Sequence, residues 1–421
     1  MKASNRIYIF ITLIIIISLG AAACSGKKEK AIESTVEKEE EVKSPGTEAE
    51  MPQPTKNEDA NSTVEATGEE DLANADSTTW TFKTEGGIAS SPVCLGDVVY
   101  FGSKDGNIYA VDINTKQELW RYNAGSPILS QVAIKDNSLY FGCNEIYYAV
   151  DIRSGEEIWK YDTQAEDRYK RRKDQWDYHD ASPVLNENIV YFGSGLGCVY
   201  GFDVSTGDIV WEFETENQAA VRSTPLISEG VIYFGDWNGK YYAVDIKSKQ
   251  VNWVNNYFQG FQNSVAIDGN TLILGGRDTK IHAVDIVTGE EKWVFRDPIG
   301  SWISGDPTIL NGIAYFPTSD ARLTYAFNVA DGTLVNSYKV YMNSFSKAVI
   351  YNDVLYITSG DARNIPGSGR LQAFQINGAQ ENIWEYRVST GSIFTSPVIW
   401  KDTIYFGSED GCLYAVSLLD R

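Results

Sequence analysis

Residues Val98–Trp120 read VVYFGSKDGNIYAVDINTKQELW, and this phrase decides the fold. It combines a strand ending in Tyr-Phe-Gly, a tight turn, a second strand ending in Ala-Val-Asp, another turn and a Trp. The phrase recurs at intervals of about 40 residues, as in repeat folds built from strands and turns. Its eight copies predict an all-β, eight-bladed β-propeller with four-stranded blades. The Tyr of Tyr-Phe-Gly, or the residue in its place, falls at Tyr100, Tyr140, Tyr191, Tyr233, Ile273, Tyr315, Tyr356 and Tyr405.

The first repeat shows how one phrase becomes a blade. We expect Gly87–Val93 to be the innermost strand, Val98–Gly102 the second and Asn107–Asp112 the third, with a fourth strand ending at Trp120. Gly106 supplies the positive φ of the hairpin turn between the second and third strands. An Asp opens the next turn, because its carboxylate accepts backbone N–H groups two or three residues further on.

A Trp follows this Asp at a regular offset in most repeats. A large ring at this spacing lies across the neighbouring blade and holds the ring of blades together. Repeat 6 departs from the pattern, with Asn336 in the place of the Trp. We expect a structural docking role for Trp80, Trp120, Trp159, Trp211, Trp253, Trp293 and Trp384.

The two ends of the repeat region predict how the ring closes. The last repeat, from Ser392, reaches Arg421 just after its third strand, whereas Thr79–Lys83 is a Trp-bearing strand with no repeat before it. The N-terminal strand should therefore complete the last blade, which leaves no blade unfinished.

The amino-terminal segment resembles a bacterial lipoprotein signal. Lys2 and Arg6 precede the apolar run Ile9–Leu19, followed by small residues and Cys24, although Ala21 stands where such signals usually have Leu. The resemblance implies cleavage of a signal peptide, residues 1–23, and lipidation of the Cys24 thiol. An uncleaved anchor helix over residues 7–23 is the alternative. Both interpretations place the rest of the chain outside the cytoplasm, anchored to a bacterial membrane.

Residues 24–78 are predicted to be a disordered acidic tether between this anchor and a propeller domain at 79–421. The segment is rich in Glu, Lys, Ser and Thr and poor in large apolar side chains, so it cannot bury enough surface to offset its ordering entropy. The whole chain carries a formal net charge of −21. That charge argues against a nucleic-acid partner and favours solubility.

The string AVDIVTGEEKW, residues 283–293, resembles the tryptophan-docking repeat of the quinoprotein propellers, the PQQ-like repeat superfamily. The resemblance covers residues 80–421. Together with the lipoprotein-like start, it makes the chain most similar to the BamB-type lipoproteins of outer-membrane β-barrel assembly. For the BamB type, it implies protein partners in the cell envelope. If the cell has an outer membrane, Ser25 fits the sorting rule of such lipoproteins for that membrane.

Enzymes of the same superfamily imply an alternative function, a PQQ-dependent dehydrogenase with calcium, or a degenerate relative of one. Its alcohol dehydrogenases carry an adjacent Cys pair and a catalytic Asp beside the calcium. This chain has no Cys-Cys pair, no CxxCH and no G-x-S-x-G, and His282 occupies a position where other repeats have Tyr. We therefore expect no catalytic residue, no metal and no cofactor. The cysteines after Cys24 are expected to be small buried hydrophobic residues, and one disulfide between two of them is the alternative. They are Cys94, Cys143, Cys198 and Cys412.

Irregular links between repeats are the candidate binding surface. The link Asp162–Asp180 contains RYKRRK, residues 168–173, which is either a site for an acidic or phosphate-bearing partner or a solvated loop. Aromatic residues of other links should be exposed on the same face, and Arg, Trp and Tyr often anchor interfaces. The candidate partner-binding residues are Arg168, Lys170, Arg171, Arg172, Trp176, Trp237, Tyr257, Phe258, Phe261 and Trp302.

The start of each innermost strand should line the central channel. Residues in this place include Arg222, Asp306 and Lys347, a mixed polar set that would hold water or a small polar ligand. Taken together, the sequence predicts a lipid-anchored, extracytoplasmic propeller that serves as a non-catalytic protein-binding scaffold, by resemblance in envelope protein assembly. A ligand-sensing or adhesive surface lipoprotein is a further alternative.

Overall fold

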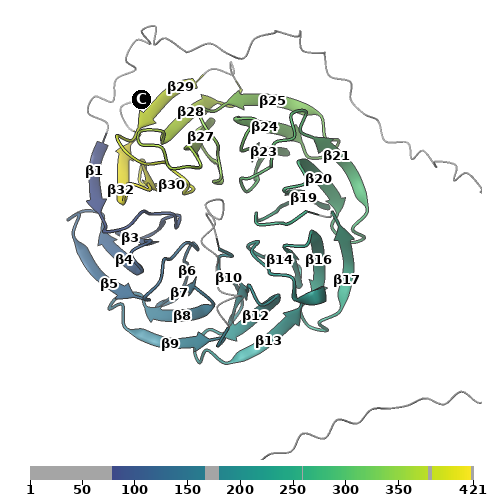
Figure 1. Cartoon of the computed structure of the whole chain (residues 1–421), viewed down its shortest axis with the longest axis horizontal. Helices are drawn as coiled ribbons and strands as arrows, with labels where there is room; N and C mark the ends of the chain where they lie inside the picture. The colour runs from purple at the N-terminus through teal and green to yellow at the C-terminus, as the bar shows by residue number, and fades with distance from the viewer. Residues whose placement is uncertain (1–77, 166–179, 258, 378–381, 419–421) are drawn as a thin grey trace, which may run out of the picture. The chain divides into compact units, whose positions relative to one another are not determined.

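The computed structural model describes residues 78–165, 180–257, 259–377 and 382–418. In this part of the chain, eight antiparallel four-stranded sheets follow one another around a central axis (Figure 1). The prediction of an eight-bladed all-β propeller is confirmed. Apart from strands, the described residues form one short 3-10 helix, η1 (Glu216–Gln218). No described helix is long and apolar enough to cross a membrane.

The blades are numbered along the chain, and each is given from its innermost to its outermost strand. Blade 1 consists of β2 (Val93–Leu95), β3 (Val98–Gly102), β4 (Asn107–Asp112) and β5 (Glu118–Asn123). Blade 2 consists of β6 (Ala133–Lys135), β7 (Ser138–Cys143), β8 (Ile146–Asp151) and β9 (Glu157–Asp162). Blade 3 consists of β10 (Val184–Asn186), β11 (Ile189–Gly193), β12 (Cys198–Asp203) and β13 (Ile209–Glu214). Blade 4 consists of β14 (Leu226–Ser228), β15 (Val231–Gly235), β16 (Lys240–Asp245) and β17 (Val251–Asn256). Blade 5 consists of β18 (Ala266–Asp268), β19 (Thr271–Gly275), β20 (Lys280–Asp285) and β21 (Glu291–Arg296). Blade 6 consists of β22 (Thr308–Leu310), β23 (Ile313–Pro317), β24 (Leu323–Asn328) and β25 (Leu334–Lys339). Blade 7 consists of β26 (Val349–Tyr351), β27 (Val354–Ser359), β28 (Arg370–Gln375) and β29 (Asn382–Arg387). Blade 8 consists of β30 (Val398–Trp400), β31 (Thr403–Gly407), β32 (Cys412–Ser417) and β1 (Thr78–Lys83).

The innermost strands are shorter than predicted. In blade 1 the strand covers Val93–Leu95, not Gly87–Val93. The chain before it bonds to neighbouring turns instead of to β3: the Lys104 N–H donates to the Gly87 carbonyl at 2.8 Å, and the Ile88 N–H donates to the Ser408 carbonyl at 2.9 Å. Backbone groups used between blades are not available to extend the sheet.

Blade 8 is closed by the N-terminal strand, as predicted. β1 pairs antiparallel with β32, with Trp80 opposite Ala415 and Lys83 opposite Cys412. The Trp80 ring meets Tyr405 edge to face at 6.0 Å between centroids. Because the first strand of the fold completes the last sheet, the described part of the propeller closes into a ring (Figure 1).

In blades 1 to 5 a docking tryptophan joins the blade to the next one. The indole N–H of Trp120 donates to the Ile152 carbonyl at 3.0 Å, and the same bond is repeated by Trp159, Trp211, Trp253 and Trp293 onto Val204, Ile246, Ile286 and Val329. The ring also lies on the glycine of the next turn. At Gly207, where φ is +74°, an added Cβ would lie 2.7 Å from Trp159 Cδ2. That turn therefore needs glycine for both its backbone and the space above it.

Candidate partner-binding face

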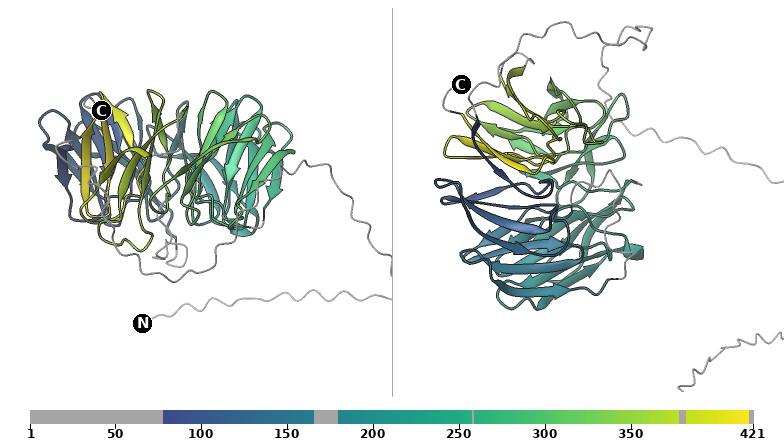
Figure 2. Two further views of the ribbon diagram at one scale, coloured as in Figure 1. Left: turned by 90° about the horizontal axis from the view of Figure 1, so that it is seen from above. Right: turned by 60° about the vertical axis from the view of Figure 1, so that its left-hand side comes forward.

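The links between blades and the turns from second to third strand lie on one face of the propeller, here called the link face. Figure 2 shows in side view how the strands run between this face and the opposite one. Seven predicted site residues lie outside the described part of the chain: Cys24, Arg168, Lys170, Arg171, Arg172, Trp176 and Phe258.

Four described residues of the link face stack on one another in alternation. The Arg222 guanidinium lies 4.9 Å from the centroid of the Trp237 ring, and the Arg277 guanidinium lies 4.3 Å from the same ring. Arg277 also lies 4.6 Å from the Trp302 ring. We call this set, Arg222–Trp237–Arg277–Trp302, the arginine–tryptophan ladder.

The ladder is assembled from different blades, and backbone bonds position its residues. Trp237, in the turn β15–β16, donates its N–H to the Ala220 carbonyl at 2.8 Å, and the Trp302 carbonyl accepts from the Ser319 N–H at 3.1 Å. The Arg277 guanidinium donates to Gln262 Oε1 at 2.8 Å. Gly260 lies beneath Trp237, where a Cβ would come within 2.8 Å of the Trp237 carbonyl oxygen.

This arrangement suits recognition of oxyanions. A guanidinium that is stacked on an indole face keeps its N–H donors in the plane of the group, where a carboxylate or phosphate binds with two parallel hydrogen bonds. Stacking on aromatic rings also fixes a long side chain, so less entropy is lost when the anion binds. Trp237 and Trp302 are half-buried, as expected of rings that serve both packing and contact.

The expected exposure of Phe261 is wrong. Phe261 is 1% exposed, and its ring packs edge to face on Tyr241 at 5.4 Å and on Tyr257 at 5.5 Å. The reason is Gly235: a Cβ there would lie 2.5 Å from Phe261 Cβ, so the missing side chain makes room for the ring between blades. Tyr257 is half-buried, and its ring contacts that of His282 at a tilt of 43°, with 4.2 Å between the centroids.

Residues at the start of the innermost strands form a belt of hydrogen bonds between blades. Backbone N–H groups of one blade donate to short side chains of the next: Gln131 to Ser182 at 3.0 Å, Ser182 to Thr224 at 2.9 Å, Ser264 to Asp306 at 2.7 Å, Lys347 to Ser396 at 2.8 Å and Ser396 to Ser91 at 2.9 Å.

Asp306 and Lys347 belong to this belt, and the Lys347 side chain is exposed. Arg222 does not belong to it, because it lies two residues before the belt position Thr224 and stacks in the ladder instead. The belt has a sequence signal that was missed, since a Pro follows Ser91, Ser182, Thr224, Asp306 and Ser396.

His282 is held between two carboxylates. Its Nε2 lies 2.7 Å from Asp278 and its Nδ1 lies 2.9 Å from Glu291, which requires a proton on each ring nitrogen. Burial opposes charging of the ring, but the hydrogen bonds to Asp278 and Glu291 outweigh it and raise the pKa of His282. In turn, the hydrogen bond from His282 lowers the pKa of Glu291.

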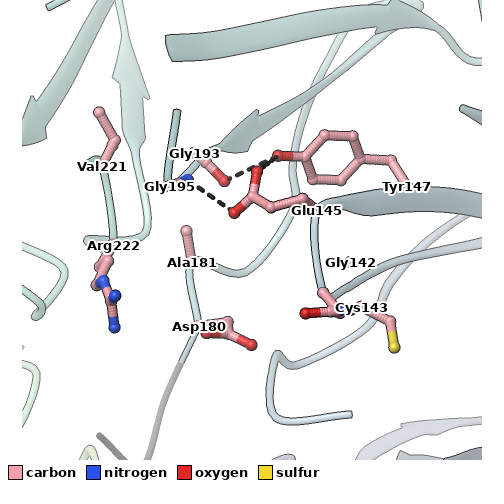
Figure 3. A pocket seen from close by; sticks show the side chains of 11 residues that line it. Gly142, Cys143, Glu145, Tyr147, Asp180, Ala181, Gly193, Gly195, Val221 and Arg222 are labelled. Atoms are coloured by element: carbon pink, nitrogen blue, oxygen red, sulfur yellow. Dashed lines mark hydrogen bonds between the residues drawn. The ribbon is translucent and has the colours of Figure 1, made fainter. Parts of the chain in front are cut away.

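A cavity of about 40 Å³ borders the ladder between blades 2 and 3 (Figure 3). Its lining includes the side chains of Glu145, Asp180 and Arg222. Glu145 accepts hydrogen bonds from the Ser194 hydroxyl at 2.5 Å and from the Gly195 N–H at 2.7 Å. Burial raises the pKa of Glu145, and the Asp180 carboxylate adds to the rise, while those hydrogen bonds and Arg222 oppose it.

The alternative of a PQQ-dependent dehydrogenase would require a calcium site. Calcium takes six to eight oxygen ligands, mostly from carboxylates and carbonyls. Among the described residues, no three His, Cys, Asp or Glu side chains lie close enough to share a metal ion. The four described cysteines, Cys94, Cys143, Cys198 and Cys412, are free thiols.

The blades, the docking tryptophans and the closing strand define a propeller of PQQ-like repeats. A model of the family described as outer membrane protein assembly factor BamB matches residues 59–255 and 255–420, and the chain belongs to this family. No curated protein shows significant similarity to the sequence.

Solved structures share the fold. BamB from Moraxella catarrhalis is 19% identical with a TM-score of 0.58, covering 70% of this chain and 88% of its own. Quinohemoprotein alcohol dehydrogenase from Comamonas testosteroni is 12% identical with a TM-score of 0.65, covering 82% and 77%. The computationally designed Ika8 protein is 16% identical with a TM-score of 0.65, covering 80% and 97%. At these identities the likeness concerns the fold alone, which binding proteins, enzymes and designs can all adopt.

Proposed function

We propose that this protein is a lipid-anchored, extracytoplasmic scaffold that binds protein partners through its link face and acts in outer-membrane protein assembly without catalysing a reaction. The arginine–tryptophan ladder is the observation that carries the proposal. It offers two stacked guanidiniums and two half-buried indoles, the residue types that most often dominate interface energies.

The chemistry of the ladder defines the partner segment. Guanidiniums pair with carboxylates, and indole faces take apolar or aromatic side chains, so a strand or loop bearing Asp or Glu beside apolar residues fits best. The basic residues 168–173 lie outside the described part of the chain, and their charge would favour the same kind of acidic partner. Family membership supports an assembly partner at the outer membrane.

Site-specific crosslinking in intact cells tests the partner. A photoreactive residue at Trp302 should crosslink to a component of outer-membrane β-barrel assembly, and Arg277→Gln should reduce that product severalfold. Lys247→Gln removes one exposed cation from the opposite face and should leave it unchanged. Charge reversal at Arg168, Lys170, Arg171 and Arg172 should weaken the same capture, and added salt should do so as well.

The anchor needs a separate test. Cys24→Ala should abolish incorporation of labelled fatty acid and leave the precursor uncleaved. A mature wild-type protein beginning elsewhere than Cys24 would contradict lipid anchoring. Stoichiometric binding of PQQ with calcium, together with oxidation of an alcohol or sugar, would overturn the proposal that the protein is not an enzyme.

A further inference from the structure

The cavity between blades 2 and 3 is lined both by a half-buried acid, Glu145, and by the first residue of the ladder, Arg222. Glu145 lies in the two-residue turn between β7 and β8, and Arg222 lies in the link before β14. Both line the cavity, and Arg222 stacks directly on Trp237. A change of charge at Glu145 would therefore change the electrostatic potential at Arg222 without any movement of the blades.

Glu145 combines a left-handed backbone with a carboxylate that is held by groups of the next blade. Asn144 and Glu145 have φ values of 53° and 64°, in the left-handed region where two-residue hairpins usually place Asn and Gly. Left-handed φ values recur at glutamates of other tight turns, Glu187 and Glu229, so the conformation follows from the turn. The carboxylate is then fixed across the blade boundary by Ser194 and Gly195 of the turn β11–β12.

Several groups face Glu145 from the elements packed around it. Tyr147 of the same hairpin faces Glu145, and Cys143 lies beside it. Thr163 donates a hydrogen bond to the Glu145 backbone carbonyl, and Ser194 and Gly195 of the turn β11–β12 donate to its carboxylate. Asp180, before β10, and Arg222, before β14, line the same cavity. Burial and the Asp180 carboxylate favour the neutral form of Glu145, and Arg222 favours the charged form.

We infer that Glu145 is a positioning and regulatory residue for the ladder: its protonation removes a compensating charge beside Arg222 and strengthens the binding of an acidic partner segment. The inference rests on the proposed function and adds a proton-linked control to it. When Glu145 is ionised, it offsets part of the positive potential of Arg222. When it takes up a proton, that offset is removed and the potential that Arg222 presents to the partner becomes more positive.

The test uses a short dye-labelled peptide rich in sulfotyrosine, whose sulfates stay charged throughout the titration. Binding to the full-length wild-type protein should tighten about fivefold as the pH falls through the raised pKa of Glu145, the size expected for one nearby charge. Glu145→Gln should bind tightly at every pH, with a flat profile. Glu290→Gln removes an exposed carboxylate from the opposite face and should keep the wild-type pH response.

A second readout separates regulation from a merely structural role. Because linkage is reciprocal, peptide binding to the wild type should take up protons near the pKa of Glu145, measured by calorimetry in buffers of different ionisation enthalpy. Glu145→Gln should take up none, and Arg222→Gln should bind weakly with no pH response.

Wild-type binding that does not change with pH, or an unchanged pH response in Glu145→Gln, would overturn the inference while leaving the binding function intact. Wild-type protein that fails to bind the peptide at any pH would contradict the anion-binding role of the ladder itself.

Discussion

The Tyr338 hydroxyl donates a hydrogen bond to the Ile376 carbonyl at 3.1 Å. In blades 1 to 5 a docking Trp makes this bond to the residue that follows the turn-opening position. Blade 6 has Asn336 in the Trp position, and Tyr338, two residues further along β25, reaches the equivalent acceptor from the same face of the strand. Its ring also lies 6.3 Å from Tyr315, much as Trp120 lies 6.0 Å from Tyr100. Tyrosine therefore replaces tryptophan as the docking residue of blade 6.

Tyr338→Phe should destabilise the fold by about 1–2 kcal/mol, because the Ile376 carbonyl loses its buried donor. Urea unfolding followed by tryptophan fluorescence measures the change. Tyr191→Phe is the matched control, since the Tyr191 hydroxyl is buried with no hydrogen-bond partner among the described residues. Its removal should cost little or nothing. Equal losses in the two variants would contradict the docking role of Tyr338.

Gly207→Ala should cost about 3 kcal/mol, because the added methyl group meets the docked Trp159 ring and the backbone is left-handed. Gly230 has a similar φ of +78°, but no described atom lies within 4 Å of the Cβ position. Gly230→Ala should therefore cost only about 1 kcal/mol, the backbone contribution. Thermal unfolding of the two variants separates the contact with Trp159 from backbone strain.

Trp80→Ala should lower the free energy of unfolding by about 3–5 kcal/mol, as for the loss of a large core aromatic. Trp80 is 8% exposed and belongs to the strand that closes the ring. Thr81→Ala changes an exposed neighbour on the same strand and should stay within about 0.5 kcal/mol of the wild type. A Trp80 variant as stable as the Thr81 variant would show that β1 contributes little to closure.

The hydrogen bonds of His282 to Asp278 and Glu291 should make the free energy of unfolding fall as the pH rises. The pKa of His282 is raised in the folded state, so its contribution is fully present below the unfolded value of about 6.5 and is lost as the pH passes the folded pKa. His282→Tyr places there the residue of blades 1 and 4, where Tyr109 and Tyr242 donate to Asp105 and Asp236. Urea unfolding across this pH range should show a decline in the wild type that the variant lacks.

Features that repeat could be predicted from sequence, and features made between unlike segments could not. The blade number, the closing strand and most docking residues follow from a phrase that recurs at a fixed offset. Tyr338 was missed because its ring replaces an indole from a position two residues away. Phe261 was placed on the surface because its burial depends on the small Gly235 of the neighbouring β15. The ladder joins links and turns of different blades, so it could not be predicted from residue spacing within one repeat.

β1 has a direction as well as a partner. It begins at Thr78 beside Val416, on the face opposite the ladder, and ends at Lys83 beside Cys412, on the link face. An anchor pulling through the chain before Thr78 and a partner held on the link face would draw the propeller from opposite sides. The force would then run along β1, and its hydrogen bonds to β32 would be sheared together instead of breaking one by one. The strand that closes the ring would thereby resist mechanical tension between membrane and partner.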